Sequence, residues 1–195
     1  MRPLLAGAAG GRQRGRGAGS VSPLQRRGQR ARRGLSCGGD VLRSGLGVAL
    51  TVVVLDQLTK AIVLGTFETG QAVAVTPFLN LVLVWNRGVS FGMFASGGAF
   101  APWLLSGLAL AVVIGLTAWL RRTDQWLTAL GLGLVIGGAL GNVIDRVRFG
   151  AVVDFLDFHL AGYHWPAFNV ADAGICVGAA LMLADGLLTR QSQPT

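Results

Sequence analysis

Charged residues are scarce in this chain: Asp, Glu, Lys and Arg together make up 13% of its 195 residues. Ordinary soluble domains carry about 25%, and here 52% of the residues are hydrophobic, so an ordinary soluble domain is excluded. Only two cysteines are present, which excludes a disulfide scaffold. Cys176 falls in an apolar run and is expected to be a small buried packing residue. The 30 glycines fit a bundle of membrane helices, in which small residues let backbones approach closely.

The net charge of +8 belongs to one end of the chain. Residues 1–43 contain ten arginines and one acid, Asp40, whereas residues 44–195 contain seven Lys or Arg and eight Asp or Glu, a net charge of −1. A segment of Arg, Gly and Ser with few large apolar residues cannot bury enough surface to fold. Residues 1–40 are therefore expected to be a disordered Arg/Gly-rich cytoplasmic extension, or the product of a start codon placed too early. Residues 41–190 are expected to form the single folded domain.

Nucleic acid and anionic lipid are the two partners that such a basic tail could attract. Nucleic-acid bases stack on aromatic side chains, and residues 1–40 contain none. No nucleic-acid partner is therefore predicted, and an attraction to anionic membrane lipids stays open.

Four apolar stretches are each close to the roughly 20 residues that cross about 30 Å of hydrocarbon. They cover residues 41–64, 100–120, 126–144 and 170–188. Between the first two, residues 78–85 have the composition of a β-strand, and several glycines, beginning with Gly88, punctuate the next stretch. The sequence predicts an all-α membrane protein with four transmembrane helices and a small extramembrane β-like platform between helices 1 and 2.

The basic residues predict the orientation of the four spans. Thirteen of the 17 Lys and Arg lie in the tail, at Arg121-Arg122 and at Arg190, which all fall on one side of the membrane. The positive-inside rule places this side, and with it both termini, in the cytoplasm.

Four acids fall at or near membrane depth: Asp56, Asp145, Asp154 and Asp172. An ionisable residue there is costly and is a functional-site hypothesis by default. Asp145 lies 19 residues beyond Trp126, about 28 Å along the outward-running third span at 1.5 Å per residue. Asp172 falls in the first turn of the fourth span. The acids are therefore predicted to meet near the outer leaflet.

Two carboxylates in a partly dry site do not both ionise readily, so one holds a proton while the other acts as a base. Such a pair activates water for attack on a peptide carbonyl and then protonates the leaving amine. Asp154 and Asp172 are the predicted pair, because neither has a cation within four residues. Apolar neighbours should raise the pKa of Asp154, and the N-terminus of a helix favours the ionised form of Asp172.

Asp56 and Asp145 each have a cation close by in the sequence. Lys60 lies four residues after Asp56, on the same face of a helix, and Arg146 is the immediate neighbour of Asp145. An acid held ionised by a cation is a poor proton shuttle and a good scaffold. A supporting role is therefore predicted for Asp56, whereas for Asp145 the sequence leaves support and chemistry open.

Two histidines, His159 and His164, lie in the loop before the fourth span. A zinc site built from Asp and His ligands is chemically reasonable there, but the spacing matches no metal motif. No metal and no other cofactor are predicted, and the histidines are interpreted as interfacial residues beside Tyr163 and Trp165. Asp157 is expected to remain solvated.

Five short elements occur in the order found in one known family, the lipoprotein signal peptidases (signal peptidase II). DQLTK at 56–60 resembles the family's D-Q-x-[ST]-K element, and NRGVSFG at 86–92 resembles its N-x-G-x-[AS]-F element. GGALGNVIDR at 137–146 is similar to its G-G-A-x-G-N-x-x-D-R stretch, and VVDF at 152–155 and FNVAD at 168–172 complete the set. Each element alone is weak, but five in order on a frame of four spans are specific.

The resemblance implies an aspartyl endopeptidase of the bacterial inner membrane. Such an enzyme removes the signal peptide from a prolipoprotein whose lipobox cysteine carries a diacylglyceryl group, cutting just before that cysteine. The resemblance places the catalytic pair on Asp154 and Asp172. The residues expected to bind substrate or support the site are Asp56, Lys60, Asn86, Gly88, Asn142, Asp145, Arg146 and Asn169. The Arg-rich tail departs from the family pattern, since family members usually begin close to the first span.

Two other classes of protein are compatible with four spans. A small transporter or channel component would use the acids as ion relays, but no internal repeat is detectable and the acids cluster at one interface. A non-enzymatic scaffold would leave the paired Asn and Asp elements unexplained. The predicted partners are a lipid-modified prolipoprotein and membrane lipids, with the chain acting as a monomer.

Overall fold

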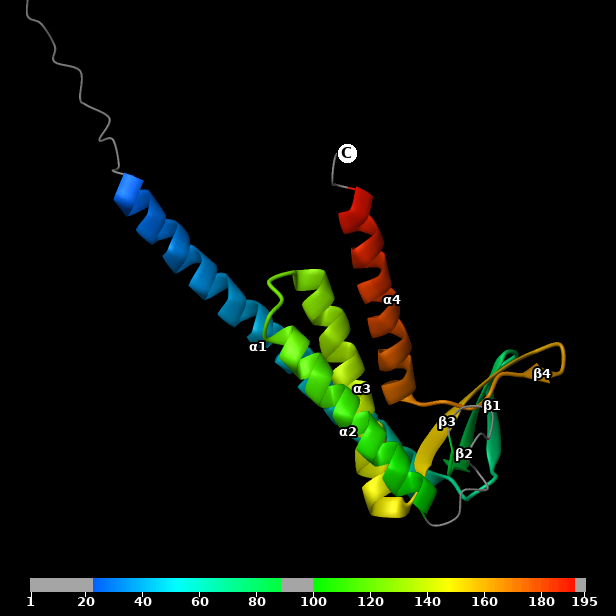
Figure 1. Ribbon diagram of the computed structural model, residues 1–195. Helices are drawn as coiled ribbons and strands as arrows, with labels where there is room; N and C mark the ends of the chain where they lie inside the picture. Colours follow the sequence, from blue (N-terminus) through cyan, green and yellow to red (C-terminus); the bar gives the residue numbers. More distant parts are fainter. Residues whose placement is uncertain (1–22, 89–99, 192–195) are drawn as a thin grey trace, which may run out of the picture. The chain divides into compact units, whose positions relative to one another are not determined.

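The computed structural model describes residues 23–88 and 100–191 (Figure 1), and for 23–38 and 189–191 it describes the backbone alone. The chain divides into two compact units, Met1–Gly34 and Leu35–Thr195. In the first unit the described residues are helical. The sheet and all predicted site residues belong to the second unit. The extension predicted at 1–40 lies in part outside the described residues, and the first helix begins within it at Pro23.

Four helices account for the predicted spans: α1 (Pro23–Thr66), α2 (Ala101–Leu120), α3 (Trp126–Phe149) and α4 (Val170–Gln191). Each contains a stretch that is long and apolar enough to cross a membrane. These stretches are Gly39–Thr66, Ala101–Leu120, Trp126–Phe149 and Val170–Leu188. The four predicted spans are therefore confirmed for the part of the chain that the structure describes.

Helix α3 is longer than the apolar run that predicted it. It continues past Ile144 to Phe149, and Gly150 ends it in the left-handed conformation with φ 70°. Glycine adopts this conformation without steric cost, which makes it a common helix terminator. Asp145 and Arg146 consequently lie inside the helix and not beyond its end.

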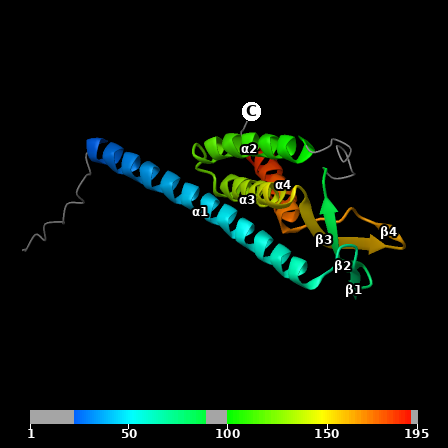
Figure 2. The ribbon, with the colours of Figure 1, turned by 90° about the horizontal axis from the view of Figure 1, so that it is seen from below.

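Four antiparallel strands form the platform, in the order β1 (Ala72–Thr76), β2 (Leu79–Asn86), β3 (Val152–Leu160) and β4 (Tyr163–His164). Strand β2 is the one predicted at 78–85. The platform is not built only from the segment between the first two helices, because β3 and β4 come from between α3 and α4. Figures 1 and 2 show the sheet at the end of the bundle where α4 begins.

Helix α3 is the buried centre of the bundle, and glycines set how closely its neighbours approach. A Cβ atom added at Gly137 would lie 2.5 Å from the carbonyl oxygen of Ala49 on α1. At Gly131 it would lie 2.7 Å from the side chain of Met182 on α4. Small residues are what bring membrane helices together, because lipid provides no hydrophobic force between them. The outward faces of α2 expose large apolar side chains such as Leu104 and Ile114, as expected for contact with lipid.

A cluster of apolar side chains joins the sheet to the bundle. It contains Val63 near the end of α1, Leu83 of β2, and Val153 and Phe155 of β3, all buried. The register pairs Val84 with Asp154, so β2 and β3 hold this acid between the sheet and the helix ends.

Candidate active site

The two acids predicted as the catalytic pair lie where the sheet meets the ends of the helices. Asp154, on β3, is 1% exposed. Asp172, in the first turn of α4, is partly exposed and lines a cavity. Neither acid makes an ion pair within the described residues. Both are instead held by asparagine side chains.

Asp154 accepts a hydrogen bond on each carboxylate oxygen. The Nδ2 atom of Asn86 donates to Oδ2 at 2.9 Å, and the Nδ2 atom of Asn169 donates to Oδ1 at 2.7 Å. Asn86 reaches this position because β2 pairs with β3. The carboxyl group of Asp154 is therefore fixed from two sides.

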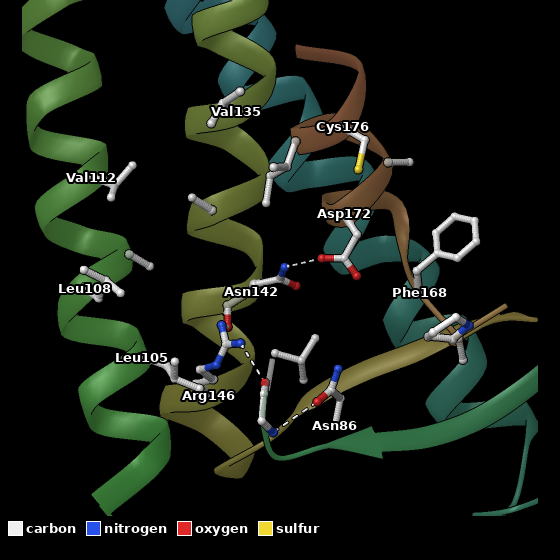
Figure 3. A pocket seen from close by; sticks show the side chains of 18 of the residues that line it. Asn86, Leu105, Leu108, Val112, Val135, Asn142, Arg146, Phe168, Asp172 and Cys176 are labelled. Atoms are coloured by element: carbon white, nitrogen blue, oxygen red, sulfur yellow. Dashed lines mark hydrogen bonds between the residues drawn. The ribbon is translucent and has the colours of Figure 1, made fainter. Parts of the chain in front are cut away.

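Asp172 is held by a second asparagine and by the start of its own helix. The Nδ2 atom of Asn142, on α3, donates to Oδ1 of Asp172 at 2.8 Å (Figure 3). The backbone N–H of Asp172 donates to Oδ1 of Asn169 at 2.9 Å, which is the contact of an N-cap residue with the third residue of a helix. Asn169 also donates from Nδ2 to Oδ1 of Asn142 at 3.2 Å. The two amides thus connect the two acids.

Burial raises the pKa of the Asp154 carboxyl to about 7, and the nearby negative charge of Asp172 acts in the same direction. The hydrogen bonds from Asn86 and Asn169 oppose this rise without cancelling it. The expected rise in the pKa of Asp154 is therefore confirmed, and its largest cause is desolvation, as predicted.

Asp56, Lys60 and Asp145 form a buried ionic cluster beside the two amides. The Lys60 ammonium lies 2.8 Å from Oδ2 of Asp56 and 2.8 Å from Oδ2 of Asp145. The pairing of Asp56 with Lys60 is as predicted. Asp145, by contrast, pairs with a lysine of another helix, and Arg146 does not pair with it, because successive residues of a helix point in different directions.

This cluster also ties the sheet and α4 to the bundle. The backbone N–H of Val153 donates to Oδ2 of Asp145 at 3.1 Å, and that of Ala171 donates to Oδ1 of Asp56 at 2.9 Å. Val153 and Ala171 each precede one of the two predicted catalytic acids. The ionic cluster therefore supports the backbone on both sides of the site.

Gln57 is a supporting residue that the sequence reasoning did not single out. Its Nε2 atom donates to Oδ1 of Asp145 at 2.9 Å and to Oδ2 of Asp56 at 3.2 Å. The signal that could have found it is its place in the DQLTK element, directly after Asp56. Its Oε1 atom accepts a hydrogen bond of 3.3 Å from Arg148.

Arg146 and Gly88 connect α3 to the segment directly after β2. The guanidinium of Arg146 donates to the carbonyl oxygens of Gly88, at 3.4 Å, and of Asn142, at 3.5 Å. The backbone N–H of Gly88 donates to Oδ1 of Asn86 at 3.1 Å. All ten predicted site residues consequently belong to one hydrogen-bonded network, part of which Figure 3 draws. The rest of the NRGVSFG element, from Val89 onwards, lies outside the described residues.

A cavity of about 700 Å³ opens beside Asp172. One end is polar, with Asn86, Asn142, Arg146 and Asp172. The walls are mostly apolar and come from α2, α3 and α4 (Figure 3), with lining residues that include Leu105, Leu108, Val112, Val135, Ile175 and Cys176. The interpretation of Cys176 as a buried packing residue is wrong, because the residue is exposed and lines this cavity.

The two histidines lie on the sheet, away from this network, and His164 contacts a third sheet residue, Asp157. Asp157 is 8% exposed and accepts hydrogen bonds of 2.9 Å from Asn80 and from Nδ1 of His164. The expectation that Asp157 stays solvated is wrong, since strand pairing buries it. Burial alone would raise the pKa of Asp157, but these hydrogen bonds outweigh it and hold the pKa below its usual value. Within the described residues no group of three or more His, Cys, Asp or Glu side chains gathers in a way that could hold a metal ion.

Comparison with known proteins gives matches over most of the chain. The family model described as "Signal peptidase (SPase) II" matches residues 48–188. A lipoprotein signal peptidase of Ralstonia nicotianae is 50% identical over 154 residues, which are 78% of this chain and 88% of the relative. A lipoprotein signal peptidase of Burkholderia mallei is 48% identical over 150 residues, 76% of this chain and 90% of the relative.

Two solved structures, both described as bacterial membrane enzymes determined by the in meso method, have the same fold. The one at 2.3 Å resolution matches with a TM-score of 0.68 and 33% identity, over 78% of this chain and 92% of the other. The one at 1.9 Å resolution matches with a TM-score of 0.65 and 32% identity, over 74% and 92%. In both cases the match covers the greater part of each chain.

Proposed function

The chain belongs to the signal peptidase II family, and from this membership we propose that it removes signal peptides from diacylglyceryl-modified prolipoproteins by two-aspartate activation of water. Family membership makes the chain a membrane-embedded peptidase of lipoprotein processing. The lipid requirement of the substrate, the cut just before the lipidated cysteine and the roles of Asp154 and Asp172 are the proposed part.

One observation carries the proposal: two acids without ion-pair partners among the described residues are joined through two asparagines, and one of the two acids, Asp172, lines the polar end of an apolar cavity. The mixed character of the cavity suits a substrate with a peptide part and acyl chains. The acyl chains would lie along the apolar side chains of α2 and α4, and the scissile peptide bond would lie beside Asp172. Pockets of this kind bind a ligand mainly through their apolar walls and orient it through a few polar groups.

The proposed reaction relies on the different surroundings of the two acids. Asp172, at the start of α4, accepts a proton from water as the water oxygen attacks the carbonyl carbon before the cysteine. Asp154, which holds a proton up to about pH 7, donates it to the carbonyl oxygen as the C–O double bond opens. Collapse of the tetrahedral intermediate breaks the C–N bond, and the proton held by Asp172 passes to the leaving amine. The hydroxyl proton returns to Asp154.

Two groups at the polar end support this chemistry by charge and orientation. Arg146 lines the cavity and carries the only cationic side chain among the described lining residues, so it can stabilise negative charge that develops on the substrate. Asn142 holds Asp172 toward the cavity. No metal ion has a part in the proposed steps.

The test of the proposal is cleavage of a purified prolipoprotein by the purified chain in detergent or vesicles. The lipid-modified precursor should yield a product that begins at the lipidated cysteine, identified by mass spectrometry, whereas the unmodified precursor should stay uncut. A transporter or a scaffold would give no product from either. Equal cleavage of both precursors would refute the lipid requirement.

We expect cleavage to decline as the pH rises through about 7. The pKa of Asp154 is raised to about 7, so its acid form is present below that pH and lost above it. Once Asp154 is ionised, it has no proton to give to the carbonyl oxygen, and kcat/KM should fall about tenfold for each further pH unit. The measurement is a pH profile of kcat/KM for the lipid-modified substrate, because kcat/KM reports the pKa values of the free enzyme. A value that keeps rising to about pH 9 would contradict the assignment of Asp154 as the acid.

We also propose that the chain is a monomer of the bacterial inner membrane with both termini in the cytoplasm. The basic residues on the side of Arg121, Arg122 and Arg190 support this orientation. The site would then face the outer leaflet, and residues 1–40 would form a cytoplasmic extension that attracts membrane lipids without taking part in catalysis. A reporter that is active only in the periplasm should therefore give no signal when fused after Arg190. A strong signal would mean that the orientation is reversed.

A further inference from the structure

Lys60 makes one more contact than charge neutralisation needs. Its side chain is 2% exposed, and its ammonium group pairs with Asp56 on its own helix and with Asp145 on α3. Its Nζ atom also donates to Oδ1 of Asn142 at 3.2 Å. An ammonium has three hydrogens and no acceptor, so these three oxygens use all of its donors.

The contact with Lys60 decides which way the Asn142 amide points. An amide has an oxygen that accepts and a nitrogen that donates, and only the oxygen can face an ammonium. With Oδ1 toward Lys60, the Nδ2 atom faces Asp172 and donates to it at 2.8 Å. A reversed amide would set a donor against the ammonium and an acceptor against the carboxylate. Both contacts would then be repulsive.

Oδ1 of Asn142 also links the ionic cluster around Lys60 to Asp154. Asn169 donates from Nδ2 to Oδ1 of Asn142 at 3.2 Å and to Oδ1 of Asp154 at 2.7 Å. A reversed Asn142 amide would place its own donor against that of Asn169. Oδ1 of Asn142 thus accepts from both Lys60 and Asn169. The hydrogen bond from Lys60 is the stronger of the two, because its donor is charged.

We infer that Lys60 is a positioning residue: by fixing the orientation of the Asn142 amide, it holds Asp172 and, through Asn169, Asp154 in the arrangement that cleavage needs. The inference rests on the proposed function of the two acids. Lys60 itself does not line the cavity, so it acts through Asn142 and not on the substrate.

The test uses a charge-balanced pair of substitutions. Lys60→Met alone would leave two buried carboxylates without a cation and would risk unfolding the chain. Asp56→Asn together with Lys60→Met removes one charge of each sign, so the net charge of the cluster is kept. The one carboxylate that remains, Asp145, still accepts from Gln57 and from the N–H of Val153, and the amide oxygen introduced by Asp56→Asn can still accept from the N–H of Ala171. Because a hydrogen bond from a charged donor is lost, kcat should fall about tenfold or more, while KM for the lipid-modified prolipoprotein stays unchanged.

A double-mutant cycle with Asn142→Ala separates positioning from general damage. If Lys60 acts through Asn142, the paired substitutions should lower kcat in the natural background and cause no further loss in the Asn142→Ala background. Losses that multiply, or a rise in KM with kcat unchanged, would overturn the inference.

Thr128→Val is the matched control for stability. Thr128 donates to Asp185 in a polar contact between α3 and α4, 14 residues and about 21 Å along α3 from Asn142. This substitution should lower the melting temperature and leave kcat unchanged. An equal fall of kcat in Thr128→Val would mean that lost stability explains the Lys60 result, and the inference would fail. If the natural chain cleaves, Asp154→Asn does not, and the paired variant keeps full kcat, the inference fails while the proposed function stands.

Discussion

Replacing Asp154 or Asp172 by asparagine is expected to abolish cleavage, with kcat lower by about a thousandfold or more. An amide can neither hold the proton that the carbonyl oxygen needs nor accept one from water. The loss should appear in kcat and not in the amount of inserted protein, because each acid is held by hydrogen bonds to asparagines and not by an ion pair that the substitution would break. Cleavage of a lipid-modified prolipoprotein, followed beside binding of the same substrate, measures both quantities.

Two other acids of the same region serve as controls. Asp157→Asn, three residues along β3 from Asp154, should leave cleavage unchanged, since the side chain of Asp157 hydrogen-bonds to the sheet residues Asn80 and His164 and not to the network. Asp145→Asn should lower the yield of folded protein or weaken cleavage only in part, because it loosens the cluster around Lys60 without removing the acid or the base. A well-folded Asp145→Asn without activity, beside an active Asp154→Asn, would show that the pair has been assigned wrongly.

Gly137→Val is expected to prevent accumulation of folded protein. A side chain at this position would begin 2.5 Å from the carbonyl oxygen of Ala49 and 2.8 Å from Cβ of Val52. Backbone atoms of α1 cannot turn aside as a side chain can, so the two helices must separate, at a cost of about 3 kcal/mol or more. Separation would also pull Asp56 and Lys60 away from α3. The measurement is the yield of monodisperse protein in detergent and its melting temperature.

Gly115→Val provides the matched control for this prediction. Gly115 lies on α2, also within a span, and an added Cβ atom there meets nothing within 4 Å. The yield and the melting temperature of this variant should stay close to those of the natural chain. A similar loss in both variants would mean that the destabilisation comes from β-branching in a helix and not from the contact between α1 and α3.

The parts of the fold that sequence predicts well here are those governed by local physics. Apolar length gave the four spans, and the spacing of Asp56 and Lys60 gave their ion pair. Strand β3 was missed because its first four residues, Val152 to Phe155, are all buried. The alternation of apolar and polar residues that marks a half-exposed strand is therefore absent. Its pairing with β2 joins segments that are distant in the chain, as the contact of Asn86 with Asp154 across 68 positions illustrates.

For the candidate site, the sequence predicted which residues belong to it better than it predicted which of them contact one another. Charge and spacing predicted the four acids and Lys60, the family resemblance added the asparagines, Gly88 and Arg146, and in the structure these ten residues form one network. The sequence pointed to the neighbouring Arg146 as the cation beside Asp145. The actual partner of Asp145 is Lys60, which is distant in the chain and adjacent in space. The exposure of Cys176 could not be read from an apolar run, because a wall of a cavity and a packed core have the same composition.

Whether Asp154 and Asp172 act as one unit can be measured from kcat for Asp154→Asn, Asp172→Asn and the double variant, each on the same lipid-modified prolipoprotein. Residues that work as a unit give losses that do not add, since removing either one already removes the function. All three variants are therefore expected to fall to the same background rate. A single variant that keeps substantial turnover, or a double variant whose loss is the product of two partial losses, would contradict this expectation.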